Sequence, residues 1–203
     1  MSASALVLAG GKSRRLGTDK RRVRLASGRE LLEDTIQTVA SLADEVLVTL
    51  GDEFGAFAEL GSRGVRLVED EIPGSGPLGG LVAGLAAARN DLVVVVACDL
   101  PYLNAGLLRW LLSLASESDL VVPRRADGTL EMLHAVYRRS CRQVARDRLM
   151  AGRFRLSDLA ESLLTTGRSV RFVEEGDLRR EDPDLKSFFN LNTPDDLRQL
   201  PRS

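Results

Sequence analysis

The stretch DLVVVVACD, residues 91–99, runs through four consecutive valines before it meets a charged side chain. An alternating pattern would indicate a strand with one wet face, whereas an unbroken apolar run is typical of a parallel strand covered on both faces. Similar short runs, which we also expect to be strands, lie at 5–10, 45–50, 65–70 and 119–123. Helical patterns separate them at 29–43, 78–90 and 104–118. This alternation predicts right-handed βαβ units around a mostly parallel sheet.

The rhythm changes after residue 123, although the chain shows no linker, internal repeat or low-complexity segment. Further strands are expected at 131–137, 169–175 and 187–190, and further helices at 139–152 and 193–200. The last helix has the clearest start signal, because Thr193 can cap it and Pro194 fits its first turn. We therefore expect a single domain, residues 1–203, of the α/β class: a three-layer Rossmann-like sandwich with helices on both faces of the sheet.

Composition limits the functions open to this chain. Its 203 residues include 28 lysines and arginines against 29 acidic residues, and 44% of them are hydrophobic. A nucleic-acid binder needs a large positive excess, so no nucleic-acid partner is expected. Two cysteines and one histidine are too few for a disulfide framework or a histidine-rich metal site. Because no apolar run has membrane-spanning length and no basic segment precedes an apolar one at the N-terminus, we expect a cytoplasmic protein without a membrane partner.

A glycine turn followed by basic residues, LAGGKSRRLGTDK at 8–20, indicates a site for a phosphorylated ligand. Its GKS tripeptide ends like a P-loop, but that motif needs a glycine where this chain has Leu6. A second glycine run, GSGPLG at 74–79, fits the dinucleotide fingerprint, with Asp99 twenty residues further on. Against this fit, Pro77 has no backbone N–H and the run does not directly follow the preceding strand. A nicotinamide or flavin enzyme is therefore the weaker alternative.

The stretch 8–20 is better interpreted as one nucleotide-binding device. Gly10 and Gly11 let the backbone approach a ligand and turn N–H groups toward it. The side chains in reach of a bound nucleotide would be Leu8 and Ala9 beside the base, and Arg15 and Lys20 at the triphosphate. The other basic residues of this region are expected to be solvated, or to attract anions from a distance: Lys12, Arg14, Arg21, Arg22 and Arg24.

Together these segments resemble a known family. The pattern LAGG-x-S-x-R-x-G-x-D-K is similar to the signature of nucleotidyltransferases of the molybdenum cofactor guanylyltransferase type. Later segments resemble that family's nucleotide, metal and acceptor segments in the same order: EDEIPGSGPLGGL (69–81), ACDLPYL (97–103), LHAVY (133–137) and FFNLNTPDDL (188–197). The resemblance runs from residue 6 to about residue 197.

The resemblance implies an enzyme that transfers GMP from GTP to the terminal phosphate of molybdopterin-bound molybdenum cofactor and releases pyrophosphate. It also implies Mg²⁺ as the cofactor, and it allows contacts with cofactor-delivery and acceptor proteins. Three alternatives stay open: a cytidylyltransferase acting on the same cofactor, a guanylyltransferase acting on another phosphorylated small molecule, and a non-catalytic nucleotide-binding regulator. LAGG rather than LAAG, and GPLGG after the third strand, favour the guanylyl branch.

The resemblance assigns roles on the nucleotide side. Asp99 would hold the metal, and a carboxylate at the end of a buried strand suits Mg²⁺. Lys20 would contact the phosphates, with Arg15 beside it. The plain alternatives are a turn aspartate and a solvated surface lysine. Asp70 would contact the nucleotide, and the glycine loop containing Gly79 would lie beside the guanine.

The acceptor side is expected in the second half of the chain. Residues 6–123 would form the nucleotide-binding half and residues 124–203 the acceptor-binding half, where the resemblance places His134, Asn190 and Asn192. A histidine in an apolar strand is commonly a satisfied interior residue, and we do not expect this one to act as a catalytic base. The two asparagines would share one face of a strand, and capping of the last helix is their alternative role.

Two further positions carry expectations. The family often has an asparagine in the nucleotide site after the second strand, where this chain has Gly51 or Asp52. This departure leaves the selection of the base open at that point. Cys98, next to the expected metal ligand, is expected to be a small buried hydrophobic residue.

Overall fold

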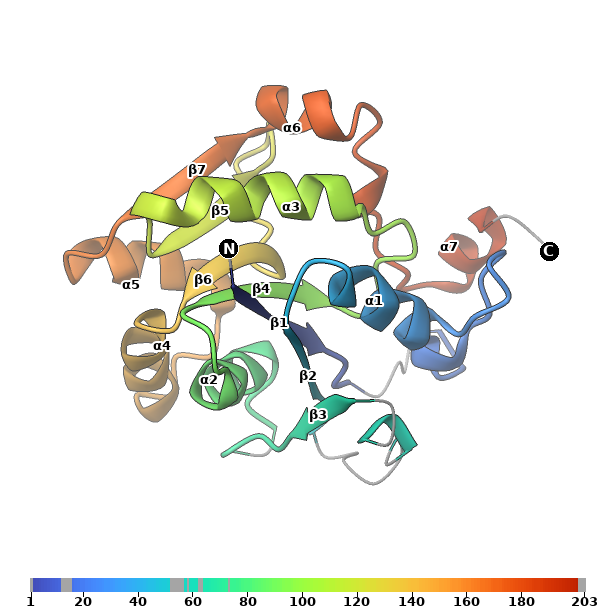
Figure 1. The fold of residues 1–203 in the computed structure, drawn as a ribbon, viewed down its shortest axis with the longest axis horizontal. Helices are drawn as coiled ribbons and strands as arrows, with labels where there is room; N and C mark the ends of the chain where they lie inside the picture. Colours follow the sequence, from blue (N-terminus) through green and yellow to red (C-terminus); the bar gives the residue numbers. More distant parts are fainter. Residues whose placement is uncertain are drawn as a thin grey trace.

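The computed structural model describes residues 2–11, 16–51, 57, 59–61, 64–72 and 74–200. Within these ranges one seven-stranded sheet has the order β3-β2-β1-β4-β6-β5-β7 (Figure 1). Its strands are β1 Ala3–Leu8, β2 Glu45–Thr49, β3 Val65–Val68, β4 Leu92–Ala97, β5 Leu120–Arg124, β6 His134–Arg138 and β7 Val170–Glu174. Neighbouring strands run parallel except at β6, which is antiparallel to both β4 and β5. The mostly parallel sheet is therefore confirmed.

Helices cover both faces of this sheet, which confirms the expected three layers (Figure 1). One face packs against α1 Leu31–Ala40, α3 Ala105–Ser113 and α6 Glu175–Glu181. The other face packs against α2 Pro77–Ala87, α4 Cys141–Met150 and α5 Leu159–Thr165. The remaining helical segments are α7 Pro194–Gln199 and the 3₁₀ turns η1 Lys20–Arg22, η3 Leu114–Glu117, η4 Leu156–Asp158 and η5 Lys186–Phe188.

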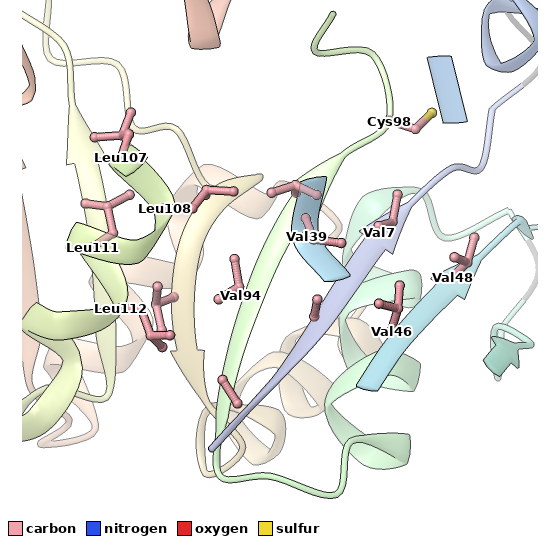
Figure 2. Close-up of a cluster of buried hydrophobic side chains, with 14 of the residues drawn as sticks. Val7, Val39, Val46, Val48, Val94, Cys98, Leu107, Leu108, Leu111 and Leu112 are labelled. Atoms are coloured by element: carbon pink, nitrogen blue, oxygen red, sulfur yellow. The ribbon is translucent and has the colours of Figure 1, made fainter. Parts of the chain in front are cut away.

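Strand β1 shows why the sheet is buried on both sides. Successive side chains of a strand point to opposite faces, so Ala5 and Val7 enter one apolar cluster while Leu6 and Leu8 enter the other. Figure 2 shows part of the first cluster, in which Val94 lies between the leucines of α3 on one side and Val7 with the valines of β2 on the other. Each fully buried aliphatic side chain contributes about 1.5–3 kcal/mol, so these two interfaces hold the strand ends in fixed positions.

The late part of the chain departs from expectation in one place. The strand predicted at 187–190 is wrong, because the chain turns there through η5 after Leu185, which has a φ of 54°. The Asp182 carboxylate makes this turn: it accepts hydrogen bonds from the Ser187 amide at 2.9 Å and from the Ser187 hydroxyl at 2.5 Å. Asn190 and Asn192 consequently lie in an irregular segment rather than on a strand face.

In the second half of the chain, the last helix was predicted correctly and two other helices were not predicted. The helix start at Thr193 is confirmed, since its side chain accepts a hydrogen bond from the Asp196 amide and Pro194 occupies the first turn. Helices α5 and α6 had not been expected. No helix in the described ranges is long and apolar enough to cross a membrane. The cytoplasmic location stays a prediction.

Candidate active site

A cavity of about 330 Å³ lies where three parallel strands end. The last residues of β1, β2 and β4, namely Leu8, Thr49 and Ala97, contribute to its wall. Open α/β sheets bind their ligands at this carboxyl edge. Much of the remaining wall is glycine: Gly10, Gly11, Gly51, Gly74, Gly76 and Gly80. The cavity therefore presents backbone groups to a ligand, as expected for the glycine turn.

Two of these glycines are required by the packing of the strand ends. A Cβ atom on Gly10 would lie 3.3 Å from the amide nitrogen of Gly51, so the loops after β1 and β2 touch through their backbones. A Cβ atom on Gly80 would lie 2.8 Å from both Leu8 Cδ2 and Thr49 Oγ1. The absence of side chains at these points brings the start of α2 close to the strand ends and keeps the cavity open.

Lys20 and Asp99 meet at the floor of this cavity. Lys20 Nζ donates a hydrogen bond to Asp99 Oδ2 at 2.7 Å, and the exposed fractions of the two side chains are only 16% and 13%. The other carboxylate oxygen, Asp99 Oδ1, is buried and accepts no hydrogen bond from the described residues. The two residues that the sequence placed at phosphate and metal are thus in direct contact, which favours the functional interpretation over a solvated lysine.

Arg21 is buried, which makes the expectation of a solvated residue wrong. It is only 4% exposed. Its guanidinium donates two hydrogen bonds to Asp19, at 2.8 and 2.9 Å, and one to the Ala9 carbonyl oxygen at 3.3 Å. The ring of Phe57 lies 4.7 Å from the same group. Arg21 therefore ties η1 to the end of β1 and fixes the position of its neighbour Lys20.

The acidic run after β3 separates into inward and outward residues. Asp70 lines the cavity, while Glu69 is exposed. Glu71 forms ion pairs with Arg142 at 3.4 Å and Arg146 at 3.6 Å, both on α4. Among these three carboxylates, Asp70 is therefore the one in position to contact a nucleotide.

A second cavity, of about 300 Å³, adjoins the first. The two share the wall residues Pro77, Ala97, Asp99 and Leu133. Of these two cavities, His134 and Asn190 line only the second. Because Asp99 belongs to both cavities, a group bound in one can meet a group bound in the other beside this carboxylate.

His134 is an interior residue, but not a satisfied one. It is 1% exposed, and neither ring nitrogen has a hydrogen-bond partner among the described residues. Its ring packs on Phe188 at a centroid distance of 4.6 Å. Burial lowers the pKa of His134 to about 4, against the opposing effect of Asp182, so the ring is neutral near pH 7. A neutral ring beside the cavity can offer a hydrogen bond to a ligand.

The two asparagines occupy different positions. Asn190 lines the second cavity and donates a hydrogen bond to the Phe188 carbonyl oxygen at 3.0 Å. Asn192 is exposed, and its backbone N–H donates a hydrogen bond to the Asp196 carboxylate at the start of α7. Between them, the Leu191 N–H donates to the Asp99 carbonyl oxygen at 2.8 Å. The segment is thus fastened beside Asp99, with Asn190 nearer to the cavities in this structure.

Two residues expected on the nucleotide side, Ala9 and Gly79, do not line the cavity. Ala9 is fully buried behind the cavity wall, where its amide bonds Thr49 O at 2.8 Å. Gly79 is also buried, and a Cβ atom there would lie 3.1 Å from Ser75 Cβ. Arg15 lies outside the described residues. The sequence interpretation had missed Glu131, which also lines the second cavity and carries no motif signal.

The donor set at Asp99 fits the Mg²⁺ that the resemblance implied. In the described ranges no three His, Cys, Asp or Glu side chains form a cluster that could hold a metal. Mg²⁺ in phosphate-transferring sites is held by one or two carboxylates together with substrate phosphates and water. The unpartnered Asp99 Oδ1, at the junction of the two cavities, is the ligand that such a site needs.

A glycine-walled cavity with Lys20 and Asp99 at its floor, joined to a second cavity, is the arrangement of a nucleotidyltransferase. Residues 5–166 match the MobA-like NTP transferase domain. A probable molybdenum cofactor guanylyltransferase of Chloroflexus aggregans is 39% identical, with 98% of this chain and 93% of that protein covered. This chain belongs to the MobA-like NTP transferase family.

Two further relatives agree with this assignment. The molybdenum cofactor guanylyltransferase of Desulfosudis oleivorans is 32% identical, with 98% of this chain and 94% of that protein covered. The crystal structure of molybdopterin-guanine dinucleotide biosynthesis protein A from Archaeoglobus fulgidus superposes with a TM-score of 0.79 at 28% identity, covering 97% of this chain and 95% of that one. The similarity therefore extends over nearly the whole chain.

Proposed function

We propose that this chain transfers the GMP moiety of GTP to the terminal phosphate of molybdopterin-bound molybdenum cofactor and releases pyrophosphate. The observation that carries the proposal is the pair of cavities joined at Asp99, since a transfer needs a donor site and an acceptor site with a common edge. The substrates come from the names of the relatives, which are molybdenum cofactor guanylyltransferases.

The first cavity is the donor site in this proposal. Its glycine walls offer backbone N–H and C=O groups to a base and to phosphate oxygens. Lys20 neutralises charge on the triphosphate as the pyrophosphate leaves. To do so the ammonium group has to exchange Asp99 Oδ2 for phosphate oxygens, and the fixed position of η1 keeps it within reach of both.

The reaction needs no strong base. An oxygen of the acceptor phosphate forms a bond to the α-phosphorus of GTP, while the bond from that phosphorus to the bridging oxygen of the β-phosphate breaks. Pyrophosphate leaves with the electron pair. A phosphate monoester is largely dianionic near neutral pH, so its attacking oxygen has no proton to lose. His134, with its pKa lowered to about 4, therefore serves binding rather than proton transfer.

Asp99 would hold Mg²⁺ through its buried, unpartnered oxygen. A bound metal would supply positive charge that offsets the negative charge of the reacting phosphates. The residues of the chain position the substrates around it: Lys20 from the donor side and Asn190 from the acceptor side. Contacts with cofactor-delivery and acceptor proteins, and a cytoplasmic location, are part of the proposal.

The test is a turnover assay with a panel of nucleotides. The purified chain is mixed with Mg²⁺, molybdopterin-bound cofactor and either GTP, CTP or ATP. Pyrophosphate release and the mass of the dinucleotide product are then measured. We expect product with GTP and little with the other nucleotides. Faster turnover with CTP would favour the cytidylyl alternative, and GTP binding without pyrophosphate release would favour a non-catalytic regulator.

A further inference from the structure

The second cavity has an unexpected charge for a site that receives a phosphate ester. Among the described residues its lining includes two carboxylates, Asp99 and Glu131, and no lysine or arginine. Much of the rest is apolar, with four leucines and Met132. A phosphate placed deep in such a cavity would lose its hydration without gaining a cation. The lining instead suits an uncharged planar group that donates hydrogen bonds.

The position of Glu131 within the cavity separates it from the reacting groups. Asp99 belongs to the junction of the two cavities, whereas Glu131 lines only the second one. The phosphate of an acceptor has to lie at the junction, where it meets the nucleotide. Glu131 is therefore placed to contact the part of the acceptor that does not react.

Local contacts hold Glu131 in a defined position. Its amide donates to the Pro123 carbonyl oxygen at 3.0 Å, and its own carbonyl oxygen accepts from the His134 amide at 3.0 Å. Its carboxylate lies 3.6 Å from Arg125 Nη1, and the side chain is 23% exposed. Burial raises the pKa of Glu131 while Arg125 opposes that rise. Hydrogen-bond donors from a ligand would stabilise the charged carboxylate and so offset the effect of burial.

His134 gives a second, independent sign of a ligand in this cavity. Its two ring nitrogens are buried and have no hydrogen-bond partner within the described part of the chain. Buried polar groups in native proteins are nearly always paired, so an orphaned pair beside a cavity indicates that the partner is a bound molecule. Glu131 and His134 thus line the same cavity, one with a carboxylate and the other with a neutral imidazole.

We propose that Glu131 recognises the amino-pyrimidinone edge of a pterin, accepting hydrogen bonds from its ring N–H and its exocyclic amino group. A carboxylate accepts two parallel hydrogen bonds from such an edge. The pterin plane then lies between the apolar walls, with His134 beside it and the phosphate at Asp99. The inference rests on the proposed function, which supplies a pterin as the acceptor.

The test measures binding of two free heterocycles, pterin and lumazine, by their fluorescence. Lumazine carries an oxygen where pterin carries the amino group, so it would turn a carbonyl toward Glu131. We expect the unaltered chain to bind pterin more tightly than lumazine. In Glu131→Gln, pterin affinity should fall about ten- to hundred-fold, the range for one well-placed bidentate pair, and the preference over lumazine should disappear. Affinity for GTP should stay unchanged.

Glu175→Gln is the matched control. Glu175 binds the same arginine, with its carboxylate 3.1 Å from Arg125 Nε, but it does not line the cavity. This variant should keep the pterin preference. Equal losses in both variants, an unchanged preference in Glu131→Gln, or no preference in the unaltered chain would each overturn the inference.

Turnover and pterin binding, measured on the same purified protein, distinguish failure of this inference from failure of the proposed function. GTP-dependent turnover of the molybdenum cofactor without a pterin preference would overturn the role of Glu131 and leave the transferase proposal standing. A pterin preference that depends on Glu131, without any turnover, would overturn the transferase proposal and leave the role of Glu131 standing.

Discussion

Lys20 shows how much a single side chain contributes at the site, because it contacts the expected metal ligand and faces the donor cavity. Lys20→Ala should lower turnover about 10²–10³-fold, the usual effect of removing one charge-stabilising donor. The thermal midpoint should also fall, because Lys20 belongs to η1 and its removal leaves the largely buried Asp99 carboxylate without its cation, so turnover is measured well below that midpoint. The measurements are steady-state pyrophosphate release and thermal unfolding. The control is Lys186→Ala, because Lys186 is exposed and lines neither cavity. Turnover near the unaltered level in Lys20→Ala would remove this lysine from the mechanism.

His134 gives a residue-level prediction for pH. Its pKa is lowered from 6.5 to about 4 by burial, so the folded chain stays neutral there while the unfolded chain takes up a proton. This contribution to stability is therefore present above pH 6.5 and is lost as the pH falls toward 4. The difference between the pKa values of the unfolded and folded chain corresponds to about 3 kcal/mol in the free energy of unfolding. Because the chain has one histidine, His134→Phe should remove the whole contribution.

The measurement is the free energy of unfolding in urea at pH 7.5, 6 and 5. The unaltered chain should lose more stability over this range than His134→Phe, while carboxylates contribute equally to both. Parallel curves for the two proteins would show that the imidazole is not kept neutral by the fold.

At the level of elements, helix α2 lies close against β1 because Gly84 has no side chain. A Cβ atom there would lie 2.8 Å from Leu6 Cγ, and Leu6 is fully buried. Gly84→Ala should therefore destabilise the chain by roughly 1–3 kcal/mol, although alanine is the better helix former. The measurement is the denaturant midpoint of unfolding.

Gly176 in α6 is the matched control for this substitution. A Cβ atom on Gly176 meets nothing within 4 Å, so Gly176→Ala should leave stability unchanged or raise it by about 0.5–1 kcal/mol. Stabilisation by both substitutions would mean that α2 can move away from β1 without cost.

The predicted elements were right where the pattern within a segment sets its structure and wrong where contacts from outside that segment set it. Strand β2 was predicted to within one residue, because an apolar run between polar ends specifies a buried strand. The antiparallel direction of β6 has no such signal, since its run of apolar residues looks like the others. The turn at η5 depends on Asp182 and could not be seen in the pattern of residues 187–190.

The same distinction applies to the site. Lys20 and Asp99 were found because glycine turns and strand-end carboxylates leave sequence patterns, and the structure brings the two into contact. The burial of Arg21 depends on Phe57, which is far along the chain, so a run of basic residues could not reveal it. Glu131 is a further example, because its place in a cavity wall leaves no motif in the sequence.

On the scale of the whole molecule, residues 6–123 and 124–203, which we propose bind the nucleotide and the acceptor respectively, interleave within one sheet. Strand β6, from the second half, lies between β4 and β5 of the first. In the described sheet β6 pairs with β4 and β5, and β7 pairs with β5, so the strands of residues 124–203 form all their ladder hydrogen bonds with strands of the preceding part. We therefore expect a single unfolding transition in urea. Fluorescence of Trp110, the one tryptophan, reports on the first half, and far-ultraviolet circular dichroism reports on all helices. Separate midpoints for the two signals would contradict this expectation.

The hydrogen bond from the Leu191 amide to the Asp99 carbonyl oxygen joins two backbones, and no side chain takes part in it. Substitutions at Asn190 or Asn192 cannot delete that bond directly, although they would alter what the segment offers to an acceptor. The chemistry of the segment that we propose meets the acceptor can therefore be changed through these two side chains, while the backbone bond keeps the segment aligned with Asp99.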